Sequence, residues 1–345
     1  MKRLQTTTMD RRDFLATGLR IAGLSAFCSA GPMILGPSAR AASALTFQLS
    51  WIKSAQYSGY FSAIENGYFS AVGLDMTFNS GGPNIDPIAN VAAGRAALGD
   101  RPIGSLALAR EKGIPIKVIG TVFQRNPFAM MSLPEKPIRS VHDMIGKTLA
   151  VSPSAKPLML NMLKDNNIDP DKVSMIPAAA DPSALVNKQV DGYMGYETNQ
   201  GVMLRVQGID VVVLNLHDLG FPETAGTLYA REDFLGPHKE SVVAFLRGAI
   251  KGWQWTLAHP EESTKLMVEK YGVAGLIPAA VLGEIKASKA FIEAGVAQRE
   301  GLLSLDLALY DKVLDTYRKA GIIKSDMKAK DLCDPQYVIA AHAAA

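Results

Sequence analysis

The sequence is poor in cysteine and histidine, and this limits the chemistry that it can carry. Cys28 and Cys333 are its only cysteines among 345 residues, and its five histidines are scattered. A disulfide framework needs more cysteines, and a zinc site needs Cys or His at close spacing. The sequence also has no phosphate-binding P-loop and no Gly-x-Ser-x-Gly nucleophile motif. We therefore expect no structural disulfide, no metal centre and no cofactor.

Long hydrophobic runs are missing as well. No segment reaches the roughly 20 consecutive apolar residues that a membrane-spanning helix needs. The apolar stretch near the amino end, residues 19–35, is interrupted by Gly23, Gly31 and Pro32. We expect the mature protein to be soluble.

The first 41 residues have the order of an export signal. The pair at the start of Arg11-Arg12-Asp13-Phe14-Leu15 precedes the apolar stretch, which is followed by the small-x-small cleavage site Ala39-Arg40-Ala41. This order is typical of a twin-arginine (Tat) signal peptide. We predict that residues 1–41 are removed on export to the periplasm. Cys28 would leave with them, and Cys333 would remain as a single structural thiol.

Positive charge is concentrated in this same segment. Residues 1–41 hold six basic and two acidic residues, so their removal changes the formal net charge from +3 to about −1. A mature chain without net positive charge offers no electrostatic argument for binding nucleic acid or an anionic membrane. We therefore expect no nucleic-acid partner.

The mature chain has the pattern of an α/β protein. Short apolar runs rich in β-branched residues alternate with helical periodicity and with glycine or proline. We expect a helix over residues 58–71, almost wholly helical structure over 238–317, and a frayed tail over 340–345. Strands are expected over residues 45–49, 74–78, 116–120, 148–151, 173–177, 191–195 and 210–214.

Several short motifs are spread over nearly the whole mature chain. They include Leu49-Ser50-Trp51, Gln56-Tyr57-Ser58-Gly59-Tyr60, Glu65-Asn66-Gly67-Tyr68-Phe69, Gly81-Gly82-Pro83, Gly94-Arg95-Ala96-Ala97-Leu98-Gly99 and Gly195-Tyr196-Glu197-Thr198-Asn199. In these motifs the chain resembles the periplasmic binding proteins of the thiamine-pyrimidine-precursor-binding (thiamine-biosynthesis-like) family. That family lies within the nitrate, taurine and sulfonate binding group.

The resemblance implies an α/β fold of type II periplasmic binding proteins, with two lobes, a ligand cleft between them and two crossover segments. Lobe 1 would take residues 43–125 and 225–330, lobe 2 residues 126–224, and a C-terminal tail residues 331–345. Pro127 and Pro222 lie near the expected crossings, where proline fixes the local backbone. The resemblance also implies a monomer that closes on a small molecule and reports its occupancy to an ABC permease in the inner membrane.

Three aromatic residues are candidates for the wall of the ligand site. Trp51 follows an expected strand, and Tyr57 and Tyr60 follow at a three-residue spacing near a helix start. Ligands of open α/β sheets bind at the carboxyl ends of strands, and flat rings suit a planar heteroaromatic ligand. The alternative is that these rings pack in the core.

Two further candidate regions follow in lobe 1. The glycine-rich turn that contains Gly82 and Asn84 can present backbone N–H groups to an anion or a polar tail, or it can be only a turn. Asp100 is expected to cap the next helix. Arg101 would either meet a ligand anion or pair with Asp100 or Asp86.

The segment around Tyr196, Glu197 and Asn199 is the most informative motif of lobe 2. A strand running into Tyr196 and Glu197 would place the carboxylate at the cleft, with Thr198 and Asn199 capping the following helix. A carboxylate there repels anions and accepts a hydrogen bond from an exocyclic amine. A structural ion pair of Glu197 with a lysine or arginine is the alternative.

The resemblance extends to an enzyme that makes the thiamine pyrimidine from its own histidine and pyridoxal phosphate. That chemistry needs a cofactor-binding lysine, a donor histidine and a cysteine-rich loop, and the matching positions here read Asp100-Arg101-Pro102 and Pro222-Glu223-Thr224-Ala225-Gly226. We therefore expect a binding protein rather than an enzyme, with a pyrimidine-type thiamine precursor as ligand. Riboflavin, a small sulfonate or nitrate-type anion, and a pyrimidine-synthesis enzyme are the alternatives.

Overall fold

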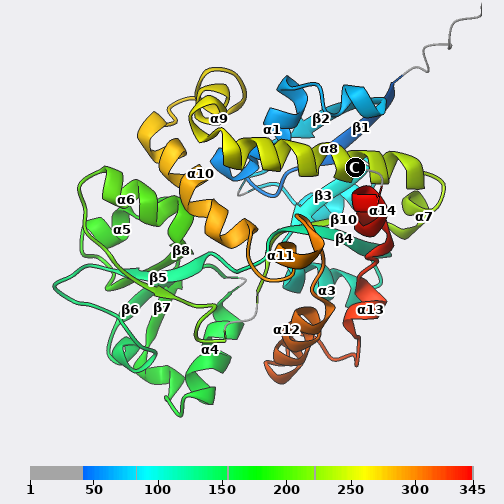
Figure 1. The fold of residues 1–345 in the computed structure, drawn as a ribbon. Coiled ribbons are helices and arrows are strands. Elements are labelled where there is room, and N and C mark those ends of the chain that lie inside the picture. The colour runs from blue at the N-terminus through cyan, green and yellow to red at the C-terminus, as the bar shows by residue number, and fades with distance from the viewer. Residues whose placement is uncertain (1–41, 83, 154, 221–222, 344–345) are drawn as a thin grey trace, which may run out of the picture. The chain divides into compact units, whose positions relative to one another are not determined.

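The computed structural model describes residues 42–343 except residues 83, 154, 221 and 222, and it contains two five-stranded sheets (Figure 1). The predicted signal peptide, with Cys28, lies outside the described residues. The first sheet has the strand order β2-β1-β3-β10-β4. Its strands are β1 (Ser43–Gln48), β2 (Leu74–Asn79), β3 (Leu98–Arg101), β4 (Ile116–Phe123) and β10 (Ala225–Arg231).

The second sheet is built from the intervening part of the chain and has the order β7-β6-β8-β5-β9. The chain therefore crosses between the sheets twice, once after Phe123 and once after Asn215. The strands are β5 (Phe128–Ser132), β6 (Thr148–Val151), β7 (Ser174–Pro177), β8 (Gly192–Tyr196) and β9 (Val212–Asn215).

Parallel pairing decides where the loops of each sheet converge. Strand β1 runs parallel to β2 and β3, and β6 runs parallel to β7 and β8. The carboxyl ends of β1, β2 and β3 therefore meet at one edge of the first sheet, as those of β6, β7 and β8 do in the second. Such edges are where open α/β sheets bind ligands.

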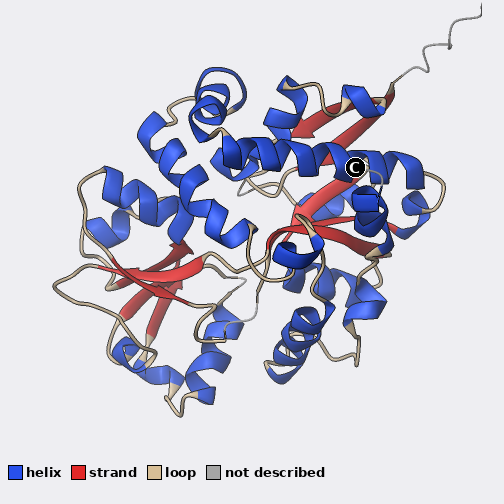
Figure 2. Ribbon diagram, viewed as in Figure 1, coloured by secondary structure: helices blue, strands red, loops and turns tan. Residues whose placement is uncertain are grey.

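Helices flank the strands of both sheets (Figure 2). In the amino-terminal part they are α1 (Ser58–Glu65), α2 (Pro87–Ala92), α3 (Ile103–Glu111), α4 (Lys156–Asp165), α5 (Ser183–Val186) and α6 (Val202–Val206), the last preceded by the π-helical turn η5 (Glu197–Gly201). After β10 they are α7 (Glu232–Leu235), α8 (Lys239–Ala258), α9 (Pro260–Leu266), the π-helical turn η6 (Met267–Tyr271), α10 (Pro278–Ile292), α11 (Ala297–Glu300), α12 (Leu307–Lys319), α13 (Ala329–Leu332) and α14 (Gln336–Ala343). The expectation of helical structure over residues 238–317 is thus confirmed.

Helix α10 connects the two sheet systems. It packs against η5 and α6, which follow the second sheet, and also against α8 and α9. A Cβ atom on Gly283 would lie 2.5 Å from a methyl carbon of Val202, so the two segments approach closely where residue 283 is glycine. At its carboxyl end, Phe291 accepts backbone hydrogen bonds from Gln124 and Arg125 of the first crossing, at 2.9 and 3.1 Å. The C-terminal helices therefore hold this crossing in place.

Three strands were missing from the expectation, and each has a physical reason. Strand β10 is buried along almost its whole length, and β5 and β3 are buried similarly. A strand covered on both faces loses the polar–apolar alternation by which half-buried strands are recognised.

Two expected boundaries were also wrong. Helix α1 ends at Glu65, before Gly67, which adopts a φ of +70°. Residues 340–343 of the expected frayed tail belong to helix α14, which packs against α8 and β4 and buries Tyr337, Val338 and Ala341. An alanine-rich end has high helix propensity, and burial of its apolar face fixes it.

Two features are absent from the described residues. None of their helices is long and apolar enough to span a membrane. Nor do they contain a group of three or more His, Cys, Asp or Glu residues placed to hold a metal ion. Cys333 is a free, buried thiol, and burial raises its pKa.

Candidate functional site

Asp100 organises the carboxyl edge of the first sheet. It lies in β3 with 1% of its surface exposed, and its two oxygens accept hydrogen bonds from the Ser50 backbone N–H at 2.8 Å and the Ser50 hydroxyl at 2.6 Å. Burial raises the pKa of Asp100 to about 6, against the opposing effects of these hydrogen bonds and of the Arg101 charge. The expected helix cap was wrong, because Pro102 is the N-cap of α3 and makes no side-chain cap. Asp100 instead fixes the loop after β1.

Tyr57 continues this network. Its hydroxyl is 2.8 Å from the Ser50 hydroxyl, and it accepts hydrogen bonds from the Trp51 backbone N–H at 2.9 Å and the Gln56 side-chain amide at 3.0 Å. Burial, and then the Asp100 carboxylate, raise the pKa of Tyr57 well above its usual value. Tyr57 therefore positions the Ser50-Trp51 loop, and its role as a ligand contact remains a prediction.

Trp51 and Tyr60 lie in different surroundings. Trp51 is half-buried in the loop after β1 and packs partly against the core. Tyr60 is 1% exposed, and its ring centroid lies 5.2 Å from that of Phe78 and 5.3 Å from that of Phe47. The core-packing alternative accounts for the ring of Tyr60, and ligand contact by Trp51 remains a prediction.

The glycine-rich turn after β2 packs directly on the same loop. The backbone N–H of Gly81 donates to the carbonyl of Trp51 at 2.8 Å, and a Cβ atom on Gly81 would lie 2.4 Å from the carbonyl oxygen of Leu49. Only glycine permits this approach of two backbones. Gly82 is half-buried and Asn84 is exposed, so both border the edge where Trp51 lies.

Arg101 is the cation of this edge. Within the described residues it forms no salt bridge, and its Nε atom is buried without a hydrogen-bond partner. The expected pairing with Asp100 or Asp86 does not occur, because Asp100 bonds to Ser50 and Asp86 caps α2 through the N–H groups of Ile88 and Ala89. The positive charge of Arg101 nevertheless acts to lower the pKa of Asp100, of Tyr196 and of Tyr229, against the larger effect of burial. Contact of Arg101 with a ligand remains a prediction.

Tyr196 brings the second sheet to the same place. It ends β8, and its ring packs on Phe128 at 4.7 Å and lies 6.4 Å from Phe123 of the first sheet. Burial, followed by the carboxylates of Glu223 and Asp100, raises the pKa of Tyr196. The ring contact with Phe123 brings Tyr196 to the end of β4 in the first sheet.

Glu197 follows immediately and is half-buried. Its Oε2 atom accepts a hydrogen bond from the Asn215 side-chain amide at 3.1 Å, and its backbone N–H donates to the Pro127 carbonyl at 3.0 Å. The ion-pair alternative does not occur, since among the described residues no lysine or arginine forms a salt bridge with Glu197. A neutral amide therefore orients the side chain of Glu197.

Asn199 makes an unexpected contact. The N-cap of η5 is Tyr196 without a side-chain cap, so the expected capping by Thr198 and Asn199 was wrong. The Asn199 amide instead donates to Glu284 of α10 at 2.5 Å. Burial raises the pKa of Glu284 to about 8, against the effect of this hydrogen bond. The contact joins the second sheet system to α10.

Ser50, Glu223 and Glu284 were not among the predicted site residues. Each is a single polar residue whose partners lie far away along the chain, as with Ser50 and Asp100, which are 50 positions apart. A polar side chain that is buried in a strand-rich core is the feature that reveals them once the fold is known, because such groups need partners.

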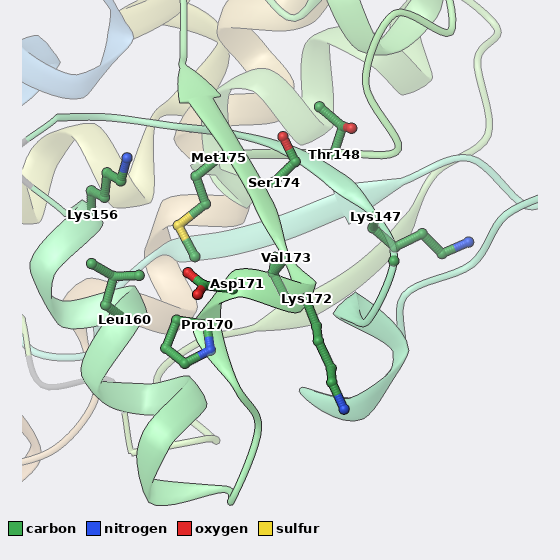
Figure 3. Close-up of a pocket in the computed structure, with 11 residues that line it drawn as sticks. Lys147, Thr148, Lys156, Leu160, Pro170, Asp171, Lys172, Val173, Ser174 and Met175 are labelled. Atoms are coloured by element: carbon green, nitrogen blue, oxygen red, sulfur yellow. The ribbon is translucent and has the colours of Figure 1, made fainter.

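Two hollows on the surface lie away from this site. One, of about 600 Å³, is lined by the first residues of β6 and β7 and by α4, at the amino ends of the strands. In Figure 3 the side chains of Lys147 and Lys172 point away from the other lining residues, so they do not form an anion cradle. The other, of about 420 Å³, lies between the end of α1 and the segment from α8 to η6. Neither includes Trp51, Arg101 or Glu197.

Comparisons with known proteins agree with this architecture. The alkanesulfonate-binding protein SsuA from Xanthomonas axonopodis pv. citri bound to MOPS is similar in structure, with a TM-score of 0.66 and 15% identity over 85% of this chain and 98% of that one. This likeness identifies the two-lobed fold of type II periplasmic binding proteins.

Sequence comparison is more informative about the family. The chain is 26% identical to the riboflavin-binding protein RibY of Chloroflexus aurantiacus, over 85% of this chain and 86% of that protein. It is 27% identical to a formylaminopyrimidine-binding protein of Halalkalibacterium halodurans, over 64% of this chain and 68% of that protein. The NMT1/THI5-like family model matches residues 54–263, and the chain belongs to the NMT1/THI5-like family.

Proposed function

We propose that the mature protein is the periplasmic solute-binding component of an ABC importer, and that its ligand is a neutral heteroaromatic with a pyrimidine ring and an N–H donor. The observation that carries this proposal is the carboxylate of Glu197, which is held by a neutral amide instead of a cation. Such a carboxylate accepts a hydrogen bond from an amine or ring N–H, whereas it repels an anion.

The aromatic groups support the same ligand class. Trp51 presents a half-buried indole beside the Ser50 loop, and Tyr196 approaches from the other sheet. Stacking of a flat ring on such a group adds roughly 0.5–1.5 kcal/mol beyond the burial of area. A planar ring between Trp51 and Tyr196 would bring its edge within reach of polar groups from both lobes.

Two relatives support a heteroaromatic ligand with a pyrimidine ring, and one of them makes riboflavin a second candidate. These relatives are a riboflavin-binding and a formylaminopyrimidine-binding protein, and both of those ligands contain a pyrimidine ring. We favour a pyrimidine-type thiamine precursor because it carries an exocyclic amine for Glu197. Riboflavin is the second candidate, because its binding protein aligns with the larger share of this chain.

Binding would proceed by closure of two lobes about the crossings. We propose that lobe 1 contains residues 43–125 and 225–330 and lobe 2 residues 126–224. We add residues 331–343, which were predicted as part of a tail, to lobe 1 because α14 packs against α8 and β4. The closed form would then be recognised by a membrane permease, and the Tat signal would deliver the protein to the periplasm. An enzyme function is disfavoured because the related enzyme needs a cofactor-binding lysine in the first lobe. At the matching position of this chain Asp100 bonds to Ser50, and no lysine takes part in the described hydrogen bonds of Asp100.

Glu197→Gln tests the proposal. The amide keeps the shape but can turn an N–H toward the ligand donor, which leaves a desolvated donor unpaired at a cost of roughly 1–3 kcal/mol. We expect weaker binding of a formylaminopyrimidine by isothermal titration, with an unchanged circular dichroism spectrum. Glu269→Gln, at an exposed position of η6, is the matched control. Tighter binding of an alkanesulfonate by the Glu197 variant, with no loss of heteroaromatic binding, would reject the role of Glu197.

A further inference from the structure

Helix α10 contacts the segments that carry both sides of the proposed ligand site (Figure 1). It packs against the short helical turn η1 (Ala55–Tyr57), in which the hydroxyl of Tyr57 accepts a hydrogen bond from the backbone N–H of Trp51. It also packs against η5, which begins with the proposed ligand acceptor Glu197. The position of η5 therefore depends in part on α10.

The contact between α10 and η5 contains a buried hydrogen bond. The side-chain amide of Asn199 donates to Glu284 Oε2 at 2.5 Å, and Glu284 is 6% exposed. One residue earlier, a Cβ atom on Gly283 would lie 2.5 Å from a methyl carbon of Val202, so the backbone of α10 lies close to the segment after η5. Asn199 is thus held by α10 at a point two residues after Glu197.

The first residue of η5 is fixed from other directions. The backbone N–H of Glu197 donates to the Pro127 carbonyl at 3.0 Å, and the side-chain amide of Asn215 donates to Glu197 Oε2 at 3.1 Å. These contacts come from the first crossing and from the second sheet, whereas the bond from Asn199 reaches α10. Short π-helical turns are rare and are frequent at functional sites. The outside contacts of η5 therefore decide how Glu197 is presented.

A buried carboxyl group is a costly choice for packing α10 against η5. Burial disfavours the charged form of Glu284 and raises its pKa to about 8. An apolar side chain would fill the position without the cost of desolvating a polar group. The carboxyl group adds direction instead, because a satisfied buried hydrogen bond makes its surroundings rigid and specifies one arrangement.

We propose that Glu284 is a positioning residue of the ligand site: through Asn199 it holds η5 against α10 and so fixes the carboxylate of Glu197 toward the ligand. Asn199, which was predicted as a ligand contact, is in this account the link between the two glutamates. The inference rests on the proposed function, because it assumes that Glu197 receives the ligand.

The test is a double-mutant cycle in the mature protein. Glu284→Met keeps a long side chain but removes the acceptor for Asn199, whereas Glu284→Gln keeps an acceptor. At pH 7, below the pKa of Glu284, glutamine matches the protonated wild-type side chain. Each variant is made alone and together with Glu197→Gln, and binding of a formylaminopyrimidine and of riboflavin is followed by isothermal titration. Lys289→Met, at an exposed position of α10, is the matched control.

We expect Glu284→Met to weaken heteroaromatic binding by about fivefold or more, because Glu197 then loses its orientation. Glu284→Gln and Lys289→Met should bind like wild type. In the Glu197→Gln background Glu284→Met should cause no further loss, because the two residues act through one ligand contact. Wild-type affinity in Glu284→Met, or an equal loss in both backgrounds, would overturn the inference.

Amide hydrogen exchange without ligand separates this inference from the proposed function. Residues 197–201 should exchange faster in Glu284→Met than in wild type, with exchange elsewhere unchanged, and Glu284→Gln should restore their protection. Wild-type exchange of this segment in Glu284→Met would also overturn the inference. If wild type binds neither heteroaromatic, the proposed ligand class is rejected, and faster exchange in Glu284→Met would still support the hold of Glu284 on η5.

Discussion

Glu284 should make the free energy of unfolding depend on pH, and the substitution Glu284→Gln should remove its contribution. Glu284 is 6% exposed, and it accepts a hydrogen bond from the side-chain amide of Asn199 at 2.5 Å. Burial raises its pKa to about 8, whereas a glutamate in an unfolded chain has a pKa of about 4.3. The folded chain therefore holds a proton that the unfolded chain loses across this pH window.

The direction and size follow from this difference. Because the folded pKa is the higher one, the stabilisation is fully present below about pH 4.3 and is lost as the pH rises to about 8. The loss is about 1.4 kcal/mol per pH unit, or about 4 kcal/mol between pH 5 and pH 8. Glu284→Gln keeps an acceptor for Asn199 and cannot ionise. Its free energy of unfolding should lack this component.

The assay is urea unfolding of the mature chain, followed by tryptophan fluorescence from pH 5 to pH 9. The buried carboxyls of Asp100 and Glu223 titrate in both proteins, so their contributions cancel in the difference between variant and wild type. The free energy of unfolding of Glu284→Gln minus that of wild type should increase by about 4 kcal/mol between pH 5 and pH 8 and then level off. Glu269→Gln should follow the wild-type curve. Parallel curves for wild type and Glu284→Gln would refute the reasoning.

Three further predictions concern the site, the packing and export. Trp51→Ala should weaken binding of a formylaminopyrimidine by 10- to 100-fold, on the order of 1–3 kcal/mol as for other base-on-aromatic stacks, and unchanged affinity in a fluorescence titration would assign Trp51 to packing. Gly104→Ala should lower the Tm by several degrees, because its Cβ would collide with Tyr317, and a Tm equal to wild type by differential scanning calorimetry would show that the contact relaxes freely. Replacing Arg11 and Arg12 with lysine should retain the precursor in the cytoplasm, and normal periplasmic yield on immunoblots would rule out Tat export.

The strands that could be predicted most directly are those with one buried face and one exposed face. Strand β2 alternates buried and exposed residues along its length, so its period of two is visible in the sequence. Strand β10 has no such alternation because it lies between β3 and β4 and is covered on both faces. The family resemblance led to the prediction that Trp51 and Arg101 lie at one edge of the first sheet. It did not predict which residues their side chains contact.

The candidate site shows the same limit. Tyr57 and Tyr60 have the spacing expected for a shared face, yet α1 turns that face toward the core, where Tyr60 packs on Phe47 and Phe78. The contacts of Glu223 depend on residues that no local spacing connects to it. Such roles are set by tertiary structure, and only the assembled fold reveals them.

The most direct test of the central claim is a thermal-shift measurement of the mature wild-type protein at pH 8.5 with four ligands: a formylaminopyrimidine, riboflavin, 1-butanesulfonate and nitrate. A ligand at about 100 times its Kd adds roughly 2.7 kcal/mol to the free energy of unfolding and raises the Tm. We predict that one or both of the pyrimidine-containing ligands raise the Tm and that the two anions do not. A shift with butanesulfonate or nitrate alone would contradict the account.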